Sequence, residues 1–245
     1  MLLITRPQPE ADALAWRLRE MGFETLAQPM LRIHFLDDSA ALASQKTPQA
    51  ILATSANGVR ALAQHRKHLG DNIPLLAIGA ATAKEARGKG FAPVSTASGD
   101  ANSLIELATR QCRPEDGELL HVCGRDISVD IVSLLRTRGF SARRATLYEA
   151  RAAEHLDDSV ATAIREKYIK GVLFYSRRTA EVWNGLVCAA DLRGHCINIT
   201  AYCLAPSAAD AAADLPFQDI ITAPHPNEAE MFALLESLAR KGLKG

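Results

Sequence analysis

The chain repeats itself, and the repeat limits the folds that it can adopt. The segment that starts at Leu2 reads LLITRPQPEADALAWRLREMGFETLAQPM, and a similar segment, LLHVCGRDISVDIVSLLRTRGFSARRATLY, starts at Leu119. Two further pairs follow in the same order: ILATSANGVRAL returns as VLFYSRRTAEVW, and LLAIGAATAKEA returns as AYCLAPSAADAA. The offset of roughly 120 residues is too long for a solenoid and fits two copies of one small domain. Two similar domains usually leave a cleft between them, so we expect a ligand to bind there.

The composition is that of an ordinary globular protein. Of the 245 residues, 48% are hydrophobic and 23% are charged. The formal net charge is +0, which argues against a general attraction to nucleic acid or to an anionic membrane. We therefore expect no nucleic-acid partner and no membrane association. An anionic ligand would have to be held by local groups rather than by the overall field.

The cysteines and the apolar runs indicate a cytoplasmic protein. The five cysteines are odd in number and include no CxxC pair, a pattern typical of reduced thiols. The N-terminal stretch has too short an apolar run and the wrong order of charges for a signal peptide. No apolar run approaches the ~18 residues that a membrane span requires.

Short apolar runs alternate with helical patterns, which predicts an α/β fold with mostly parallel sheets. The near-continuous apolar character of the runs fits strands that are covered on both faces. The first copy is predicted to hold strands at Leu2–Thr5, Thr25–Gln28, Ile51–Thr54, Leu75–Ile78 and Ala92–Ser95. The second copy is predicted to hold strands at Leu119–Val122, Ala142–Leu147, Val172–Tyr175, Thr200–Leu204 and Asp219–Thr222. Five strands per copy with intervening helices favour a flavodoxin-like sheet in each domain.

Helical spacing predicts a helix after the first strand of each copy, with stops at Gly22 and Gly139. The apolar positions that carry this prediction are Leu14, Leu18 and Met21 in the first copy and Ile127, Ile131, Leu134 and Leu135 in the second. A last helix is predicted to start after Asn227, which suits the N-cap position.

Two stretches, residues 31–46 and 149–158, show few helix or strand signals and are predicted to be linkers. Each follows the second strand of its copy and does not lie between the copies. The chain is therefore predicted to cross between its domains twice. Residues 1–34 and 153–245 would form domain one, and residues 35–152 would form domain two.

Five short motifs occur in a fixed order along the chain. They are TRP at Thr5–Pro7, TSANGV at Thr54–Val59, GAATA at Gly79–Ala83, a strand that ends in Tyr148, and LFYS at Leu173–Ser176. Together they resemble the uroporphyrinogen-III synthase family over essentially the whole chain. The turn at Ala205–Ala209 departs from the family, which often has GPTTA there, and leaves Ser207 as the remaining hydroxyl.

The resemblance implies two flavodoxin-like domains that are joined by a two-stranded linker, with the active site in the interdomain cleft. It implies a lyase that closes the linear tetrapyrrole hydroxymethylbilane to uroporphyrinogen III, a step of haem biosynthesis. Water is lost, and ring D is inverted through a spiro intermediate. No cofactor and no metal are implied, and the chain has no GxGxxG, P-loop or HExxH motif. A monomer is expected, with room for a transient hand-over of substrate from hydroxymethylbilane synthase.

A substrate with acetate and propionate arms on every ring needs many points that bind anions. The sequence repeats a suitable device, in which a strand is followed by a Gly, Ser, Thr or Asn turn and a helix start, so that free backbone N–H groups face an anion. The candidate substrate-binding residues are Thr5, Arg6, Ser55, Asn57, Gly58, Gly79, Gly124, Arg125, Ser176, Arg177 and Ser207. Tyr148 is the first catalytic candidate, as a phenol that assists departure of the hydroxyl, and Thr82 is the second.

Each candidate also has an ordinary structural explanation. Ser, Thr and Asn at helix starts are common caps, and Gly58 and Gly79 suit tight turns. Tyr148 suits the edge of a sheet. His121 and Cys123 fall on a predicted buried strand and are assigned to the core.

Two other classes of function stay open. A two-domain binding protein could close on a small polyanion without chemistry, although the lack of an export signal counts against it. A nucleotide-dependent transferase is disfavoured by the lack of a phosphate-binding loop. A metal site at His65 and His68 is discounted because no third ligand is identifiable.

Overall fold

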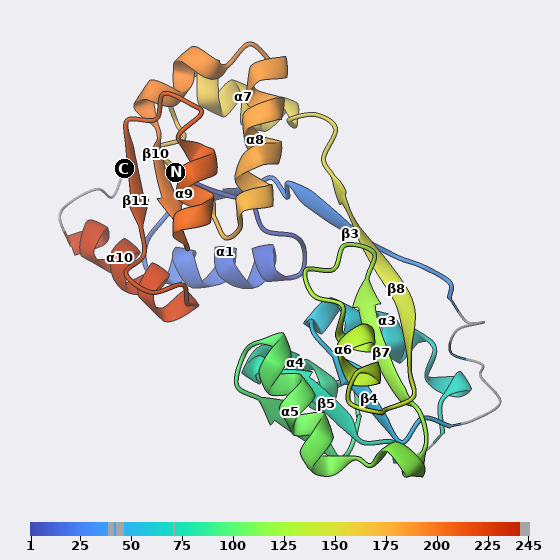
Figure 1. Ribbon diagram of the computed structural model, residues 1–245. Helices are drawn as coiled ribbons and strands as arrows, with labels where there is room; N and C mark the ends of the chain where they lie inside the picture. Colours follow the sequence, from blue (N-terminus) through green and yellow to red (C-terminus); the bar gives the residue numbers. More distant parts are fainter. Residues whose placement is uncertain (39–41, 43–46, 71, 241–245) are drawn as a thin grey trace. The chain divides into compact units, whose positions relative to one another are not determined.

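The computed structural model describes residues 1–38, 42, 47–70 and 72–240 of the chain (Figure 1). Internal contacts divide the chain into two compact units. Unit 1 comprises Met1–Arg32 and Arg151–Gly245, and unit 2 comprises Ile33–Ala150. Over the described ranges, no helix combines the length and the hydropathy that crossing a bilayer requires.

Unit 1 is built around a five-stranded parallel sheet in the order β11-β10-β9-β1-β2. Its strands are β1 (Leu2–Ile4), β2 (Thr25–Ala27), β9 (Gly171–Phe174), β10 (Thr200–Cys203) and β11 (Asp219–Thr222). Its helices are α1 (Glu10–Glu20), α7 (Asp158–Arg165), α8 (Arg177–Ala189), α9 (Pro206–Ala212) and α10 (Glu228–Arg240), with a 3-10 segment η3 (Arg193–Asn198).

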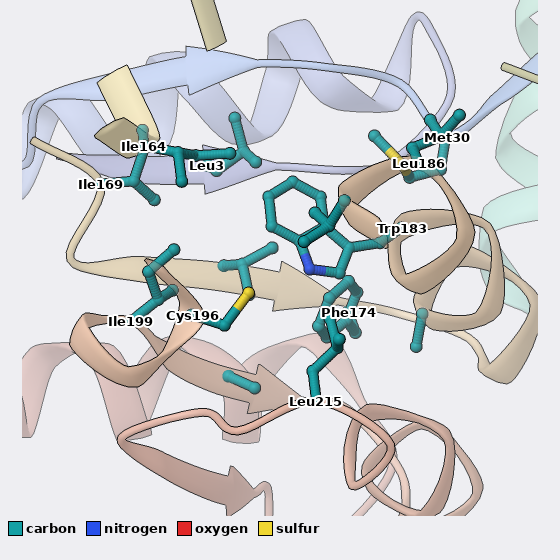
Figure 2. Packing of buried hydrophobic residues seen from close by; sticks show 14 of the residues in the cluster. Leu3, Met30, Ile164, Ile169, Phe174, Trp183, Leu186, Cys196, Ile199 and Leu215 are labelled. Atoms are coloured by element: carbon teal, nitrogen blue, oxygen red, sulfur yellow. The ribbon is translucent and has the colours of Figure 1, made fainter. Parts of the chain in front are cut away.

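Helices cover both faces of the unit 1 sheet, which explains why its strands are apolar throughout. Leu2 and Ile4 pack on the side of α1 and α10, whereas Leu3 between them packs on the side of α7, α8 and α9. Figure 2 shows this second layer, in which Trp183 of α8 is completely buried against Phe174 of β9. Their ring centroids are 6.2 Å apart and the rings are inclined by 62°, an edge-to-face contact that adds to the area they bury.

Unit 2 is built around a six-stranded sheet in the order β3-β8-β7-β4-β5-β6. Its strands are β3 (Leu31–Phe35), β4 (Ala50–Ala53), β5 (Leu75–Ile78), β6 (Val94–Ala97), β7 (Leu119–Gly124) and β8 (Ala142–Ala152). Its helices are α3 (Ala56–Gln64), α4 (Gly79–Gly88), α5 (Ala101–Gln111) and α6 (Ile131–Arg136), with 3-10 segments η1 (Arg66–His68) and η2 (Pro114–Asp116). One face of the sheet packs on α3 and α4, and the other packs on α5 and α6.

The two sequence copies exchange halves in the fold. Leu3 of the first copy lies opposite Val172 of the second in the pairing of β1 with β9. Likewise, Ile51 of the first copy lies opposite Leu120 of the second in the pairing of β4 with β7. Each sheet therefore combines two strands from the start of one copy with three strands from the end of the other. Apart from β3, both sheets show the flavodoxin-like neighbour order, which confirms the predicted fold class.

The first five residues of the predicted linker at residues 31–46 form β3, although the sequence shows few strand signals there. Strand β8 likewise continues through Ala152 into the second predicted linker. The Leu36 N–H donates to the Leu147 carbonyl at 2.8 Å, and the Ala153 N–H donates to the Met30 carbonyl at 2.9 Å, so β3 and β8 run antiparallel. Because these partners are far apart in sequence, local patterns do not reveal them. Residues 39–41 and 43–46 of the predicted linker lie outside the described part.

The helix predicted from Ile127 begins four residues later than expected. The Asp130 carboxylate accepts the Ser133 N–H at 3.2 Å and caps α6, which then starts at Ile131. Ile127 and Leu134 are 38% and 39% exposed, so they do not form the buried stripe that their spacing suggests. The cap expected at Asn227 is confirmed, because its side chain accepts the Glu230 N–H at 3.0 Å.

Gly171 makes room for its neighbours at the start of β9. A Cβ at this position would lie 2.6 Å from Cε2 of Tyr202 and 2.8 Å from Cδ2 of Leu2. A Cβ at Gly185, in α8, would meet nothing within 4 Å. The two glycines therefore form a matched pair for testing the packing of unit 1.

We predict that Gly171→Ala lowers the free energy of unfolding by about 1–3 kcal/mol through overpacking. Gly185→Ala is expected to raise it by up to about 1 kcal/mol, since alanine favours the helix. Both tryptophans, Trp16 and Trp183, belong to unit 1, so a urea titration followed by tryptophan fluorescence reports on this unit. Equal midpoints for the two variants would contradict the assigned packing.

Candidate functional site

A hollow of about 450 Å³ opens at the carboxyl edge of the unit 2 sheet. Its wall is made by the ends of β4, β5 and β7, by Tyr148 in the middle of β8, by the start of α5, and by residues 126–129 and 131. Ligands of open α/β sheets bind outside the carboxyl ends of the strands, and this volume lies within the range of small-molecule sites. The wall brings together three of the predicted site residues, Ser55, Gly124 and Tyr148.

Tyr148 and Ser55 are joined by a hydrogen bond of 2.9 Å between their hydroxyl oxygens. Ser55 is the N-cap of α3, and its Oγ also accepts the Gly58 N–H at 3.1 Å. This second bond holds Ser55 Oγ in place beside the Tyr148 oxygen, and either hydroxyl can be the donor in the bond between them. Burial, the largest influence, raises the pKa of Tyr148 above its ordinary value. The phenol therefore stays protonated at neutral pH and is able to donate a hydrogen bond.

Gly124 allows the Tyr148 ring to lie against the end of β7. A Cβ at Gly124 would come within 2.7 Å of Cε2 and Cζ of Tyr148. The register between β7 and β8 shifts at Cys123 and Gly124, and the Arg125 N–H donates to the Tyr148 carbonyl at 2.9 Å. The structure thus gives Gly124 a role in seating the ring, in addition to its place in the wall.

Each of the three predicted arginine anchors is paired with a carboxylate. The N–O distances are 2.6 Å for Arg6 with Glu228, 2.6 Å for Arg125 with Glu149, and 2.7 Å for Arg177 with Glu181. Glu149 is only 6% exposed, so the ion pair with Arg125 joins an exposed guanidinium to a buried carboxylate. An anionic ligand would have to compete with these carboxylates for the guanidinium groups.

The start of α3 is held together by its own polar groups. Asn57 Oδ1 accepts a hydrogen bond from Arg60 Nη1 at 2.8 Å, and Arg60 Nη2 lies 3.1 Å from Glu85 Oε2. A Cβ at Gly58 would lie 3.3 Å from the Val122 carbonyl oxygen, so this glycine lets α3 approach β7 closely. Asn57 and Gly58 therefore have structural tasks beside the hollow.

Gly79 and Thr82 lie in the first turn of α4, directly after β5. Gly79 has a φ of 74°, a left-handed conformation that glycine adopts without strain. Thr82 is 6% exposed, so little of its side chain faces solvent. Its catalytic role stays a prediction.

The corresponding edge of unit 1 carries the other predicted residues. Thr5 is fully buried and its hydroxyl donates to the Leu173 carbonyl, which ties β1 to β9. Ser176 caps α8 by accepting the Thr179 N–H at 3.3 Å. Ser207 is exposed in the first turn of α9. Thr5 thus serves the sheet, whereas Ser207 faces solvent.

His121, which the sequence assigns to the core, also belongs to the wall of the hollow. It is 1% exposed, and neither ring nitrogen has a hydrogen-bond partner within the described part of the chain. Burial, reinforced by the charge of Arg144, lowers the pKa of His121 from 6.5 to about 4. The signal available in the sequence is a histidine within the otherwise apolar run LLHVC.

In the parts of the chain that the structure describes, no group of three or more His, Cys, Asp or Glu side chains is placed to hold a metal ion. The five cysteines are free.

The fold and the site define a two-unit α/β protein with a ligand hollow at the carboxyl edge of a parallel sheet. A comparison with protein-family models matches residues 12–233 to the family described as uroporphyrinogen-III synthase HemD. Because the match spans most of the chain, the protein belongs to the uroporphyrinogen-III synthase family.

Known relatives agree with this assignment. The porphyrin biosynthesis protein HemD of Ruminiclostridium josui is 25% identical over 222 residues, which cover 86% of this chain. The match spans 43% of the length of that relative. A mutant uroporphyrinogen III synthase from Thermus thermophilus is 19% identical with a TM-score of 0.56, covering 100% of this chain and 99% of that one. The Helicobacter pylori uroporphyrinogen-III synthetase is 18% identical with a TM-score of 0.61, covering 97% and 98%. These two structures support the fold.

We predict that His121 remains neutral at pH 5. A histidine with its ordinary pKa of 6.5 would be mostly protonated there, whereas a pKa of about 4 leaves about nine-tenths neutral. The folded state favours the neutral form, so protonation of His121 does not lower the free energy of unfolding above pH 6.5 and lowers it progressively as the pH falls toward 4. NMR titration of the imidazole resonances measures this, with His121→Leu to identify the signal. A midpoint at or above about 6 would contradict the burial described here.

Proposed function

We propose that the chain converts hydroxymethylbilane to uroporphyrinogen III. The family match over residues 12–233 supports this reaction, and the protonated Tyr148 hydroxyl in the hollow supports the site.

The hydroxyl of the substrate leaves with a proton as water, and a conjugated cation remains. Ring D attacks this cation through its substituted carbon to form a spiro intermediate. The intermediate reopens, ring D turns over, and closure with loss of a proton completes the macrocycle. The net change is the loss of one water, so electrons balance without an oxidant or a reductant.

Tyr148 assists the departure of the hydroxyl in this proposal. Its raised pKa keeps the phenol proton in place, and a Ser55 hydroxyl that donates to the Tyr148 oxygen at 2.9 Å leaves that proton free for the leaving group. A hydrogen bond to the leaving oxygen becomes stronger as negative charge develops there, so it favours the transition state over the ground state.

Selecting the type III isomer over type I requires only a modest difference in transition-state stabilisation. Closure without the protein gives the uninverted type I macrocycle, so the site must hold ring D for attack at the more crowded carbon. A hundredfold preference corresponds to about 2.7 kcal/mol of differential stabilisation. Binding of the carboxylate arms can supply this by positioning.

We propose that the other arms bind to backbone N–H groups at helix starts, including those near Gly79, Ser176 and Ser207. Arg6, Arg125 and Arg177 take part only if the substrate replaces their glutamate partners. We further propose a cytoplasmic monomer that receives its substrate from hydroxymethylbilane synthase.

An assay coupled to hydroxymethylbilane synthase tests the proposed function. We predict that the type III isomer predominates after the product is oxidised to the porphyrin and separated by chromatography. A reaction without the chain serves as the control and should give type I. A type I product in the presence of the folded chain would rule out the synthase.

We predict that Tyr148→Phe lowers kcat several-fold or more and leaves the fold intact. The variant loses the hydroxyl that bonds Ser55 but keeps the ring that packs on Gly124. Tyr168→Phe is the matched control, because Tyr168 is 61% exposed and belongs to unit 1. An unchanged rate for Tyr148→Phe would remove this phenol from the mechanism.

A further inference from the structure

The hollow in unit 2 extends well below its rim. His121 precedes Gly124 by three residues in β7, and a strand advances about 3.3 Å per residue, so the two residues are separated by about 10 Å along the strand. Both residues belong to the wall. The hollow therefore has a floor at His121, at a depth that suits an arm of a ligand whose ring stays near Tyr148.

Three buried polar atoms at or beside this floor have no hydrogen-bond partner among the described residues. Nδ1 and Nε2 belong to His121, which lines the hollow, and Nε belongs to Arg144, which neighbours His121 but is not part of the wall. His121 and Arg144 lie directly opposite each other in the parallel pairing of β7 with β8, so their side chains leave the same face of the sheet. Buried polar groups are normally satisfied, and each unsatisfied one destabilises the fold.

The charged groups at and around the floor are Asp100 and Asp126 in the wall, and the pair of Arg144 with Asp130 beside it. Arg144 Nη2 lies 2.6 Å from Asp130 Oδ1, and Asp130 also caps α6, so this resident carboxylate is already satisfied. The unsatisfied Nε–H of Arg144 is a donor, and a neutral imidazole also carries one N–H. A carboxylate accepts from both, whereas Asp126, in the wall of the hollow, and Asp130 limit how much negative charge the floor tolerates.

We propose that His121 and Arg144 form a carboxylate-binding subsite that holds one acetate or propionate arm of the substrate. The arm reaches down to the floor, and its pyrrole ring stays beside Tyr148 and Ser55 at the rim. The subsite rests on the proposed function, which supplies a substrate with such arms. Since both ring nitrogens of His121 are covered by protein atoms, the imidazole turns toward the arm on binding. His121 is thus a positioning residue for ring orientation.

A structural role and a positioning role of His121 predict different effects of an apolar substitution on stability and on ligand binding. If His121 only fills the core, an apolar residue of similar size improves stability and leaves binding unchanged. If His121 holds an arm, the same change improves stability and weakens binding. A substitution of His121 that raises stability and also weakens ligand binding is therefore expected only if His121 holds an arm of the substrate.

His121→Leu and His121→Gln make the test. We expect His121→Leu to raise the KM for hydroxymethylbilane about tenfold or more, with a smaller effect on kcat, because a bond to a charged group is lost. We expect the same variant to raise the calorimetric melting temperature by about 2–4 °C, since the unsatisfied nitrogens are gone. His121→Gln keeps an N–H donor and is expected to hold KM within about threefold of wild type.

A binding measurement on the wild-type chain separates the subsite from the function. Uroporphyrinogen III, the product, is added anaerobically to saturation, and the His121 ring resonances are followed by NMR. A shift supports the subsite, and an unchanged spectrum overturns it, whether or not turnover occurs. A wild-type KM for His121→Leu, in a chain that forms the type III isomer, also overturns the subsite and leaves the function standing. A wild type that forms mainly type I defeats the proposed function, and the NMR result then decides the subsite.

Discussion

Strand pairing between the two sequence copies is the interaction on which the rest of the structure depends. Neither copy keeps its own five strands together, since β1 pairs with β9 and β4 pairs with β7. These pairings join residues far apart in the chain, so their loop-closure cost is met only by burial of both sheet faces. The apolar layers around Trp183 in unit 1 and on both sides of the unit 2 sheet provide that burial.

The same pairing builds the candidate site. Ser55 comes from the end of β4 in the first copy, whereas Gly124 and Tyr148 come from β7 and β8 in the second. Only because β4 and β7 are neighbours does the Tyr148 hydroxyl reach the Ser55 cap. Gly124 completes the arrangement by leaving the space that the tyrosine ring occupies. A hydrogen-bonded hydroxyl pair at a sheet edge thus follows from the exchange of halves.

Charged side chains at the two sheet edges are neutralised by neighbouring residues of opposite charge. The overall net charge is +0, and the predicted arginine anchors at the two sheet edges are each matched by a glutamate. Within the described residues, the buried polar atoms without a hydrogen-bond partner include those of His121, in the wall of the hollow, and of Arg144 beside it. Buried groups of this kind act more strongly on a ligand than exposed ones, because water does not screen them. Their presence lowers the stability of the empty fold in return for a more specific site.

The class of fold, the family and the position of most strands could be predicted from the amino-acid sequence, because apolar runs and turn residues are local signals. The sequence also indicated Tyr148, Ser55 and Gly124 as site residues through short motifs. The folded structure was needed to show that residues 31–35 form a strand beside β8, that Ile127 lies outside α6, and that the arginine anchors have glutamate partners. It also placed His121 at the floor of a hollow as well as in the core. The physical reason is that burial, strand pairing and ion pairing join residues distant in the chain, and no local pattern records those partners.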